Sequence, residues 1–320
     1  MRTIFKSRES KKLKILYTTD FHGSEATYRK FLNAGKMYGL DYLIVGGDLT
    51  GKALSPIIDL GEGRYSVQGK EMGQEGLEEA KKSIRNRGLY WVVCDRKEWI
   101  RISESQEVTD EVFKEKKIEV MKSWIALANE RYKDSKIKIF VNLGNDDQQY
   151  VADLFKDTGV IQRTEGDVVM VGEHEMISFG YVNPSPWHTP RELPEEEIYI
   201  RLKEMTDKLS DPKTAVFNFH APPYGTGLDM APKLSADLRP VARGAEITME
   251  HVGSKSVTRI IEEVQPLIGL HGHIHEAKGF EKIGRTIVLN PGSEFGNGLL
   301  HAAIVILEKE KIIGHQFIIG

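Results

Sequence analysis

Short apolar runs that each end in a polar cluster are the feature that most constrains this chain. The clusters come in a fixed order: Asp20-Phe21-His22, Gly47-Asp48, Gly144-Asn145-Asp146-Asp147, and Gly272 flanked by His271 and His273. His220 ends a further apolar run and stands alone between the third and fourth clusters. Open α/β sheets build their sites at the carboxyl ends of their strands. We therefore expect these distant side chains to meet along one edge of a sheet.

Runs rich in Val, Ile, Leu and Phe predict the strands of that sheet. Several are continuous rather than alternating, which is typical of strands covered on both faces. Strands are predicted over 14–18, 42–45, 137–142, 168–171, 176–181, 215–219, 266–270, 286–289, 302–307 and 311–319. Amphipathic helices are predicted over 118–132, from Glu195 to 209, and from Ser254 to the residue before Pro266. This order predicts an α/β fold with two stacked mixed β-sheets flanked by helices.

The segment between Asp48 and Asn145 is longer than one crossover connection needs. It contains a predicted hairpin over 57–67, a helix over 75–87 and a strand over 89–94. Structureless loops of this length are uncommon in compact domains. We therefore predict one domain over 1–320, interrupted by an inserted subdomain at about 53–108. Because it leaves the core directly after Asp48, we expect it to pack beside the polar clusters as a lid, or to form an oligomer contact.

Charge and composition narrow the partners. A formal net charge of −3 argues against a dedicated nucleic-acid binder, which would usually be basic. No apolar run is long enough to span a membrane, and the basic start over 1–14, interpreted as a solvated arm, is not followed by the apolar segment of a secretory signal. Cys94 is the single cysteine, which fits a reducing compartment. We expect a cytoplasmic protein, and a homo-oligomer remains possible.

The clustered side chains are carboxylates, imidazoles and an amide, with no thiolate. That set suits hard or borderline divalent metals, which polarise phosphate oxygens. Taken singly the signals are weak, because Asp48 could begin a turn and a lone His220 could belong to the core. Their recurrence at the ends of successive apolar runs predicts a two-metal phosphoesterase site.

The series D-x-H, G-D, G-N, H and G-H-x-H resembles the calcineurin-like metallophosphoesterases over nearly the whole chain except the insertion. Asn290-Pro291-Gly292-Ser293 is also similar to the closing loop of that family. The resemblance implies a β-sandwich flanked by helices. It implies one metal held by Asp20, His22, Asp48 and His273, and a second that shares Asp48 and is held by Asn145, His220 and His271.

The implied cofactors are two divalent metal ions. Imidazole ligands favour Mn, Fe, Zn or Ni over an all-Mg site. Two cations about 3.5–4 Å apart can share a hydroxide that attacks phosphorus in line with the leaving alcohol. No Ser or Cys nucleophile is then required.

The chain departs from the family at one position. The family commonly has G-N-H-[DE], whose His assists the leaving group, whereas this chain has Asp146 there. An ionised carboxylate is a poor proton donor, so Asp146 is a catalytic candidate whose role as general acid is open. His188 and His251 are candidate substrate-binding residues, the alternative being exposed loop histidines. His275 and His301 are interpreted as unrelated to the site.

We therefore expect a metal-dependent phosphoesterase that acts on a small phosphate ester, with a slight preference for diesters over monoesters. Two alternatives remain open. One is a Ser/Thr-type protein phosphatase, and the other is a catalytically weak or inactive metal-binding interaction module with the same fold.

Overall fold

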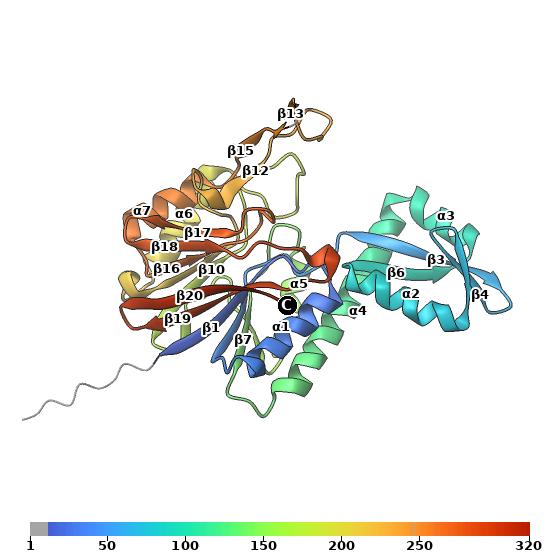
Figure 1. Cartoon of the computed structure of the whole chain (residues 1–320), viewed down its shortest axis with the longest axis horizontal. Helices are drawn as coiled ribbons and strands as arrows, with labels where there is room; N and C mark the ends of the chain where they lie inside the picture. Colours follow the sequence, from blue (N-terminus) through green and yellow to red (C-terminus); the bar gives the residue numbers. More distant parts are fainter. Residues whose placement is uncertain (1–11, 245) are drawn as a thin grey trace, which may run out of the picture.

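Two six-stranded sheets stack face to face in this computed structural model, which describes residues 12–244 and 246–320 (Figure 1). The basic residues 1–11 lie outside the described part, and so does most of the arm expected there. The first sheet has the order β20 (Lys311–Ile319), β19 (His301–Glu308), β1 (Leu13–Thr18), β2 (Tyr42–Val45), β7 (Lys138–Val141) and β8 (Ile161–Arg163). The second has the order β17 (Gly279–Ile283), β18 (Thr286–Asn290), β16 (Ile268–Leu270), β11 (Val216–Phe219), β10 (His174–Phe179) and β9 (Val169–Val171). The predicted α/β sandwich is confirmed.

Each sheet has a parallel centre. In the first sheet β1, β2, β7 and β8 run parallel, and β19 and β20 add an antiparallel edge. In the second, β18, β16, β11 and β10 run parallel, while β17 and β9 close the edges in the antiparallel sense. Parallel strands end at the same edge of a sheet, so the polar residues that follow them are brought to one side of the molecule.

Helices cover the outer face of each sheet. On the first sheet α1 (Glu25–Met37) and α4 (Gln106–Tyr132) bury Phe31 and Trp124 against Leu43. On the second, α6 (Glu195–Thr206) and α7 (Lys255–Val264) bury Ile198 and Ile260 against Phe217. The helical stripes read from the sequence are therefore core, as expected.

The inner faces of the two sheets form a separate core. It contains Tyr17, Ile44 and Phe140 from the first sheet and Val216 and Leu289 from the second, all of them at most 1% exposed. This apolar layer fixes the separation of the sheets, and with it the separation of the polar residues at their carboxyl ends.

The long segment after Asp48 forms a sheet of its own. Its strand order is β5 (Lys70–Gly73), β4 (Arg64–Val67), β3 (Ala53–Gly61) and β6 (Leu89–Cys94), and α2 (Gln74–Asn86) and α3 (Arg96–Glu104) accompany it. This unit projects sideways from the sandwich (Figure 1). Its base contacts the loop after β1, because a Cβ on Gly88 would lie 2.1 Å from the carbonyl oxygen of His22.

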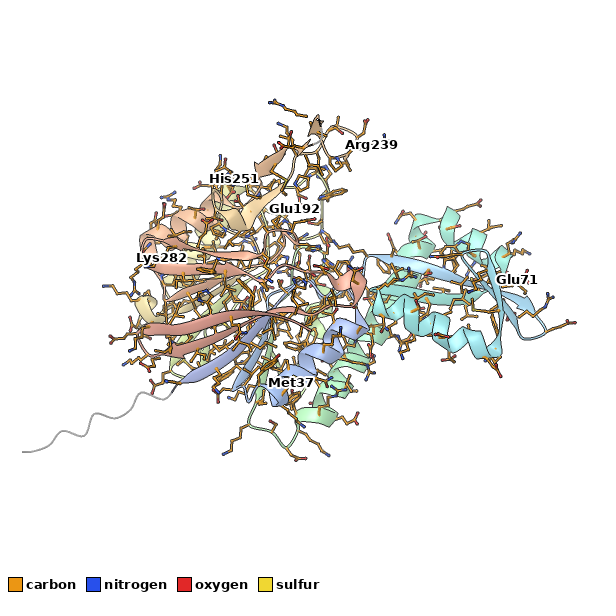
Figure 2. The ribbon with its side chains drawn as sticks, in the orientation of Figure 1. Met37, Glu71, Glu192, Arg239, His251 and Lys282 are labelled. Carbon is orange, nitrogen blue, oxygen red and sulfur yellow. The ribbon has the colours of Figure 1, made fainter. Side chains whose placement is uncertain are left out.

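A second projection is a small arm that the sequence did not predict. It contains β12 (Met230–Pro232) paired with β15 (Met249–His251), and β13 (Ala242–Arg243) paired with β14 (Glu246–Ile247). Arg239 lies toward its outer part and His251 at its base (Figure 2). The remaining elements are α5 (Tyr150–Asp153), η1 (Pro212–Thr214), η2 (Gly227–Asp229) and η3 (Phe295–Asn297). Within the described residues, every helix is too short or too polar to cross a bilayer.

Candidate metal centre

The polar clusters lie at the carboxyl ends of strands from both sheets. Asp20, Asp48 and Asn145 follow β1, β2 and β7 of the first sheet. His220 directly follows β11 of the second sheet, and the segment 271–275 follows β16. The sandwich therefore brings these clusters together, as the order of strands predicted.

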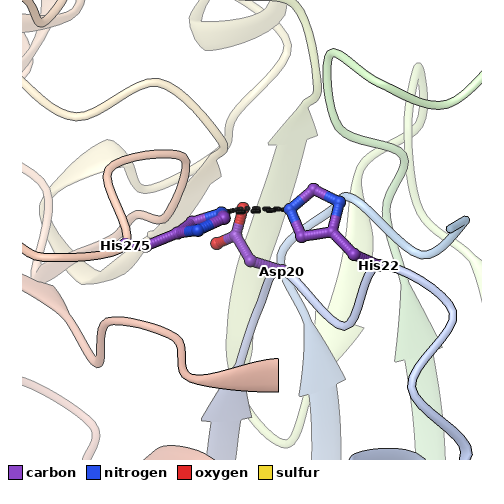
Figure 3. Close-up of side chains that lie close together, drawn as sticks. All are labelled: Asp20, His22 and His275. Atoms are coloured by element: carbon purple, nitrogen blue, oxygen red, sulfur yellow. Dashed lines mark hydrogen bonds and ion pairs between the residues drawn. The ribbon is translucent and has the colours of Figure 1, made fainter. Parts of the chain in front are cut away.

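One group contains Asp20, His22 and His275, whose ligand atoms all lie within 4.8 Å of one another. Figure 3 shows the three side chains turned toward one another. The Nε2 atom of His275 lies 3.0 Å from Nε2 of His22 and 3.5 Å from Oδ1 of Asp20. Oδ1 of Asp20 is buried and accepts no hydrogen bond within the described part of the chain. A buried carboxylate oxygen without a donor, facing two imidazoles, fits a bound cation.

A second group contains Asp48, His220 and His273. The Nε2 atom of His220 lies 3.4 Å from Oδ2 of Asp48 and 3.1 Å from Oδ1 of Asn145. The same Oδ2 of Asp48 lies 3.6 Å from Nε2 of His22, in the first group. Asp48 thus stands between the two groups, where a carboxylate shared by two ions would lie.

The structure places His271 and His275 differently from the sequence prediction. His271 is fully buried, and its Nδ1 lies 2.9 Å and 3.0 Å from the carbonyl oxygens of Phe219 and Ala221. It belongs to no candidate metal group of the described residues, whereas His275, which was interpreted as unrelated, does. His273 lies in the group of Asp48 and His220, not in that of Asp20 and His22.

The physical reason is the path of the backbone after β16. His271 directly follows the last residue of the strand, and its ring packs under the neighbouring loop. The chain then turns at His273, where φ is +68°. The turn directs His273 and His275 to the site, so G-H-x-H is carried by Gly272, His273, Ile274 and His275.

Left-handed backbone recurs at the site. Asp20, His22 and Asp48 have φ values of +57°, +42° and +52°. Such conformations cost about 1–3 kcal/mol each for residues with a side chain, and persist where the surroundings impose them. Glycines allow the close approach: a Cβ on Gly144 would lie 2.1 Å from Oδ1 of Asp48.

Asp147 imposes part of this geometry. Its buried carboxylate accepts hydrogen bonds from the backbone N–H groups of Leu49, Thr50 and Gly144 at 2.9–3.0 Å, and from the Thr50 hydroxyl at 2.8 Å. The loops after β2 and β7 are thereby joined. Asp147, the last residue of the third polar cluster, therefore stabilises the backbone that carries Asp48 and Asn145.

No family model matches the sequence. One curated relative, the uncharacterized protein MJ1162 of Methanocaldococcus jannaschii, is 39% identical over 117 residues. That match covers 36% of this chain and 46% of the relative, less than half its length. Two solved structures match over 97% of this chain and 99% of theirs, each with a TM-score of 0.54. One is 19% identical, and the other, TT1561 of Thermus thermophilus, is 13% identical.

At such identities the likeness concerns the fold. Two stacked mixed sheets carry the D-x-H, G-D, G-N, H and G-H-x-H series at their carboxyl ends. The chain shares the fold of these two structures.

Burial and neighbouring charges shift the pKa values of ionisable groups at this edge of the sandwich. Burial raises the pKa of Asp48 to about 6, and the neighbouring Asp146 adds to that rise. Burial alone would lower the pKa of His220, but the carboxylates of Asp48 and Asp20 outweigh it and raise this pKa to about 9. The buried cluster therefore retains protons that bound cations would replace.

Asp146 lies at the site, but its carboxylate is paired. Its Oδ2 lies 2.8 Å from the ammonium of Lys52, and its backbone N–H donates to Oδ1 of Asp48 at 2.9 Å. Burial opposes the charge of Lys52, yet Asp146 and Asp48 raise the pKa of Lys52 above its ordinary value. Lys52 was not predicted, because a lysine four residues after Asp48 in a turn carries no recognisable pattern.

A cavity of about 1160 Å³ opens over the site. Asp48, Asn145, His273 and His275 line it together with Lys52. Its other lining residues come from α4, from the loop after β10, from the base of the arm and from the start of α7.

The two predicted substrate-binding histidines differ in their position relative to the cavity. His251 lines it, whereas His188 is exposed and does not, although its neighbours Trp187 and Thr189 do. The cavity is lined by no described residue of 53–108. The inserted unit approaches the site at the backbone of His22, through Gly88, and contributes no side chain to the cavity lining.

Proposed function

We propose that this protein is a metal-dependent phosphoesterase that hydrolyses a small phosphate ester, with diesters preferred over monoesters. The observation that carries the proposal is the meeting of two imidazole–carboxylate groups at Asp48, one containing the unpartnered oxygen of Asp20. This donor set fits two divalent cations, for which Mn, Fe, Zn and Ni are the candidates.

The ligands divide into two sets that share Asp48. One ion would be held by Asp20, His22, Asp48 and His275, and the other by Asp48, Asn145, His220 and His273. Such cations supply Lewis acidity toward phosphoryl oxygens and lower the pKa of water. The neutral amide of Asn145 limits the negative charge that an approaching phosphate meets.

Lys52 places a positive charge beside the ligands and within the cavity. We assign it to a non-bridging phosphoryl oxygen of the substrate, which an ammonium stabilises as charge develops. Asp146 then acts as a positioning residue for Lys52. A carboxylate at this position also repels a dianionic monoester more than a monoanionic diester, which supports the preference for diesters.

The test combines metal analysis with turnover. We expect the protein loaded with Mn²⁺ to hydrolyse bis(4-nitrophenyl) phosphate faster than 4-nitrophenyl phosphate. Asp48→Asn should lower bound metal and remove most turnover of both esters. His315→Gln, on β20 and outside the cavity lining, is the matched control and should change neither. Near wild-type turnover by Asp48→Asn at excess metal would refute the proposal.

A further inference from the structure

The part of the cavity formed by the base of the arm and the start of α7 contains Tyr224, His251 and Lys255. Their side chains are neighbours: the ring centroids of Tyr224 and His251 lie 5.6 Å apart, and the Lys255 ammonium lies 5.1 Å from the Tyr224 centroid. None of the three belongs to the candidate metal groups. A phenol, an imidazole and an ammonium thus face one part of the cavity.

His251 is held in place by a buried carboxylate. Its Nδ1 lies 2.7 Å from Oδ1 of Asp229, which is fully buried. The carboxylate of Asp229 also accepts from the backbone N–H groups of Gly225, Thr226 and Gly253 at 3.0–3.1 Å. Asp229 is therefore immobile, and it leaves Nε2 of His251 as the ring nitrogen open to the cavity.

The donors of this cluster are not used within the described residues. Lys255 forms no ion pair there, and the Tyr224 hydroxyl has no hydrogen-bond partner there. The nearby acids have other partners: Glu195 accepts from the N–H groups at the start of α7, and Glu250 lies 3.6 Å from Lys233. Three polar groups, one of them an ammonium, remain for a ligand.

The size of the cavity indicates where that ligand comes from. Drug-sized ligands occupy pockets of about 300–1,000 Å³, and this cavity of about 1160 Å³ exceeds them. A phosphate group at the metal ligands would fill a small part of it. The cavity therefore has room for a long second substituent on the phosphate ester that the proposed phosphoesterase hydrolyses.

We propose that Tyr224, His251 and Lys255 bind a second anionic group of the substrate, a phosphate or a carboxylate, remote from the phosphate that is hydrolysed. This inference rests on the proposed function and specifies its substrate class. Asp229 is the positioning residue for His251. Esters whose second substituent ends in an anion are the preferred substrates, and neutral esters of equal length are poor ones.

The experiment uses 4-nitrophenyl phosphodiesters whose second substituent ends in a methyl, a carboxylate or a phosphonate group at equal chain length. We expect wild-type kcat/KM to be at least about tenfold higher for an ester with an anionic substituent than for the ester that ends in methyl. One or two charge-assisted hydrogen bonds imply a difference of this size. His251→Gln and Lys255→Met should each bring this ratio close to one. A comparison of kcat/KM for the carboxylate and phosphonate esters shows whether the site prefers a carboxylate or a phosphate. Lys282→Met, on β17 and outside the cavity lining, should keep the ratio.

A binding measurement separates this inference from the proposed function. Calorimetry compares a straight-chain alkane bisphosphonate with the monophosphonate of equal length, both resistant to hydrolysis. Tighter binding of the bisphosphonate that is lost in His251→Gln and Lys255→Met supports the site even if no ester is turned over. Equal affinity of the two probes for wild type, or an anionic-to-methyl ratio that both variants leave unchanged, overturns it.

Discussion

The Nε2 atoms of His22 and His275 lie 3.0 Å apart, although the residues are separated by 253 positions in the sequence. Both atoms also face Oδ1 of Asp20, at 3.8 Å and 3.5 Å. Two imidazole nitrogens at this distance share a proton or turn toward a common cation. The unpartnered oxygen of Asp20 favours the cation, because a shared proton would leave that oxygen unsatisfied.

This relationship predicts which histidines control metal content. His275→Ala should lower the number of bound ions from two to one, because it removes an imidazole that faces Asp20. His271→Asn should keep both ions and lower the free energy of unfolding by about 1–3 kcal/mol, because it disturbs hydrogen bonds to two buried carbonyls. Elemental analysis after dialysis and urea denaturation measure the two effects. The reverse pattern would restore His271 as a ligand.

The pair formed by Lys52 and Asp146 predicts a second result. Lys52→Met should lower kcat/KM for aryl phosphodiesters by about 10²-fold, because a charge aimed at the phosphoryl group is lost. Lys52→Arg should recover part of that loss. Asp146→Asn should cost less, about tenfold, since the ammonium remains but is no longer held. Equal losses in Lys52→Met and Lys52→Arg would show that the charge itself is not used.

Leaving-group dependence tests the absence of an imidazole at position 146. Wild type should hydrolyse nitrophenyl esters well and simple alkyl esters poorly, because an alkoxide needs a proton. General-acid assistance is typically worth about 10²–10⁴-fold, so Asp146→His should raise the alkyl rate more than the aryl rate. Rates across a leaving-group series at fixed metal loading measure the slope. Identical slopes for the two proteins would mean that another group supplies the proton.

Metal binding should release protons. The pKa of about 9 at His220 keeps its imidazole protonated at pH 7 without metal, and the pKa of about 6 at Asp48 keeps part of that carboxyl protonated near pH 6. Both must lose their protons to act as ligands, so apparent metal affinity should rise with pH up to about 9. Calorimetry in buffers of different ionisation enthalpy counts the protons. A count of zero at pH 7 in wild type would contradict the prediction, and His220→Asn should lower the count.

Asp147 predicts an effect on stability. Asp147→Ala leaves the donors of Leu49, Thr50 and Gly144 without their partner, which should cost about 3 kcal/mol of unfolding free energy. Asp153→Ala is the control, because its carboxylate is exposed and pairs only with Lys156 at the surface. It should change stability by less than about 0.5 kcal/mol. Urea unfolding followed by circular dichroism measures both.

Much of the fold could be predicted from the sequence, because buried parallel strands are written as continuous apolar runs. The strands at 42–45, 89–94 and 311–319 begin and end where the runs do. The arm over 230–251 could not be predicted, since strands of two or three residues leave no periodicity. The placement of Asp20, His22, Asp48, Asn145 and His220 at one edge followed from their positions after such runs.

The assignment of the last histidines could not be made in the same way. His271, His273 and His275 alternate, and alternation alone places all three on one side of an extended chain. The turn at His273 breaks that rule, and it has no signature in a segment of His, Gly and Ile. Lys52 was missed for a related reason, because only the folded chain shows that its ammonium reaches Asp146.

Two of the three candidate metal groups take side chains from each of the two sheets: Asp20 and His22 with His275, and Asp48 with His220 and His273. An ion bound by either group would therefore link the two sheets, which are otherwise joined at this edge by loops. Its removal would let the layers part there first, while the apolar layer of Tyr17, Phe140 and Leu289 keeps the rest closed. In this chain, metal binding would therefore also hold the two sheets together at this edge.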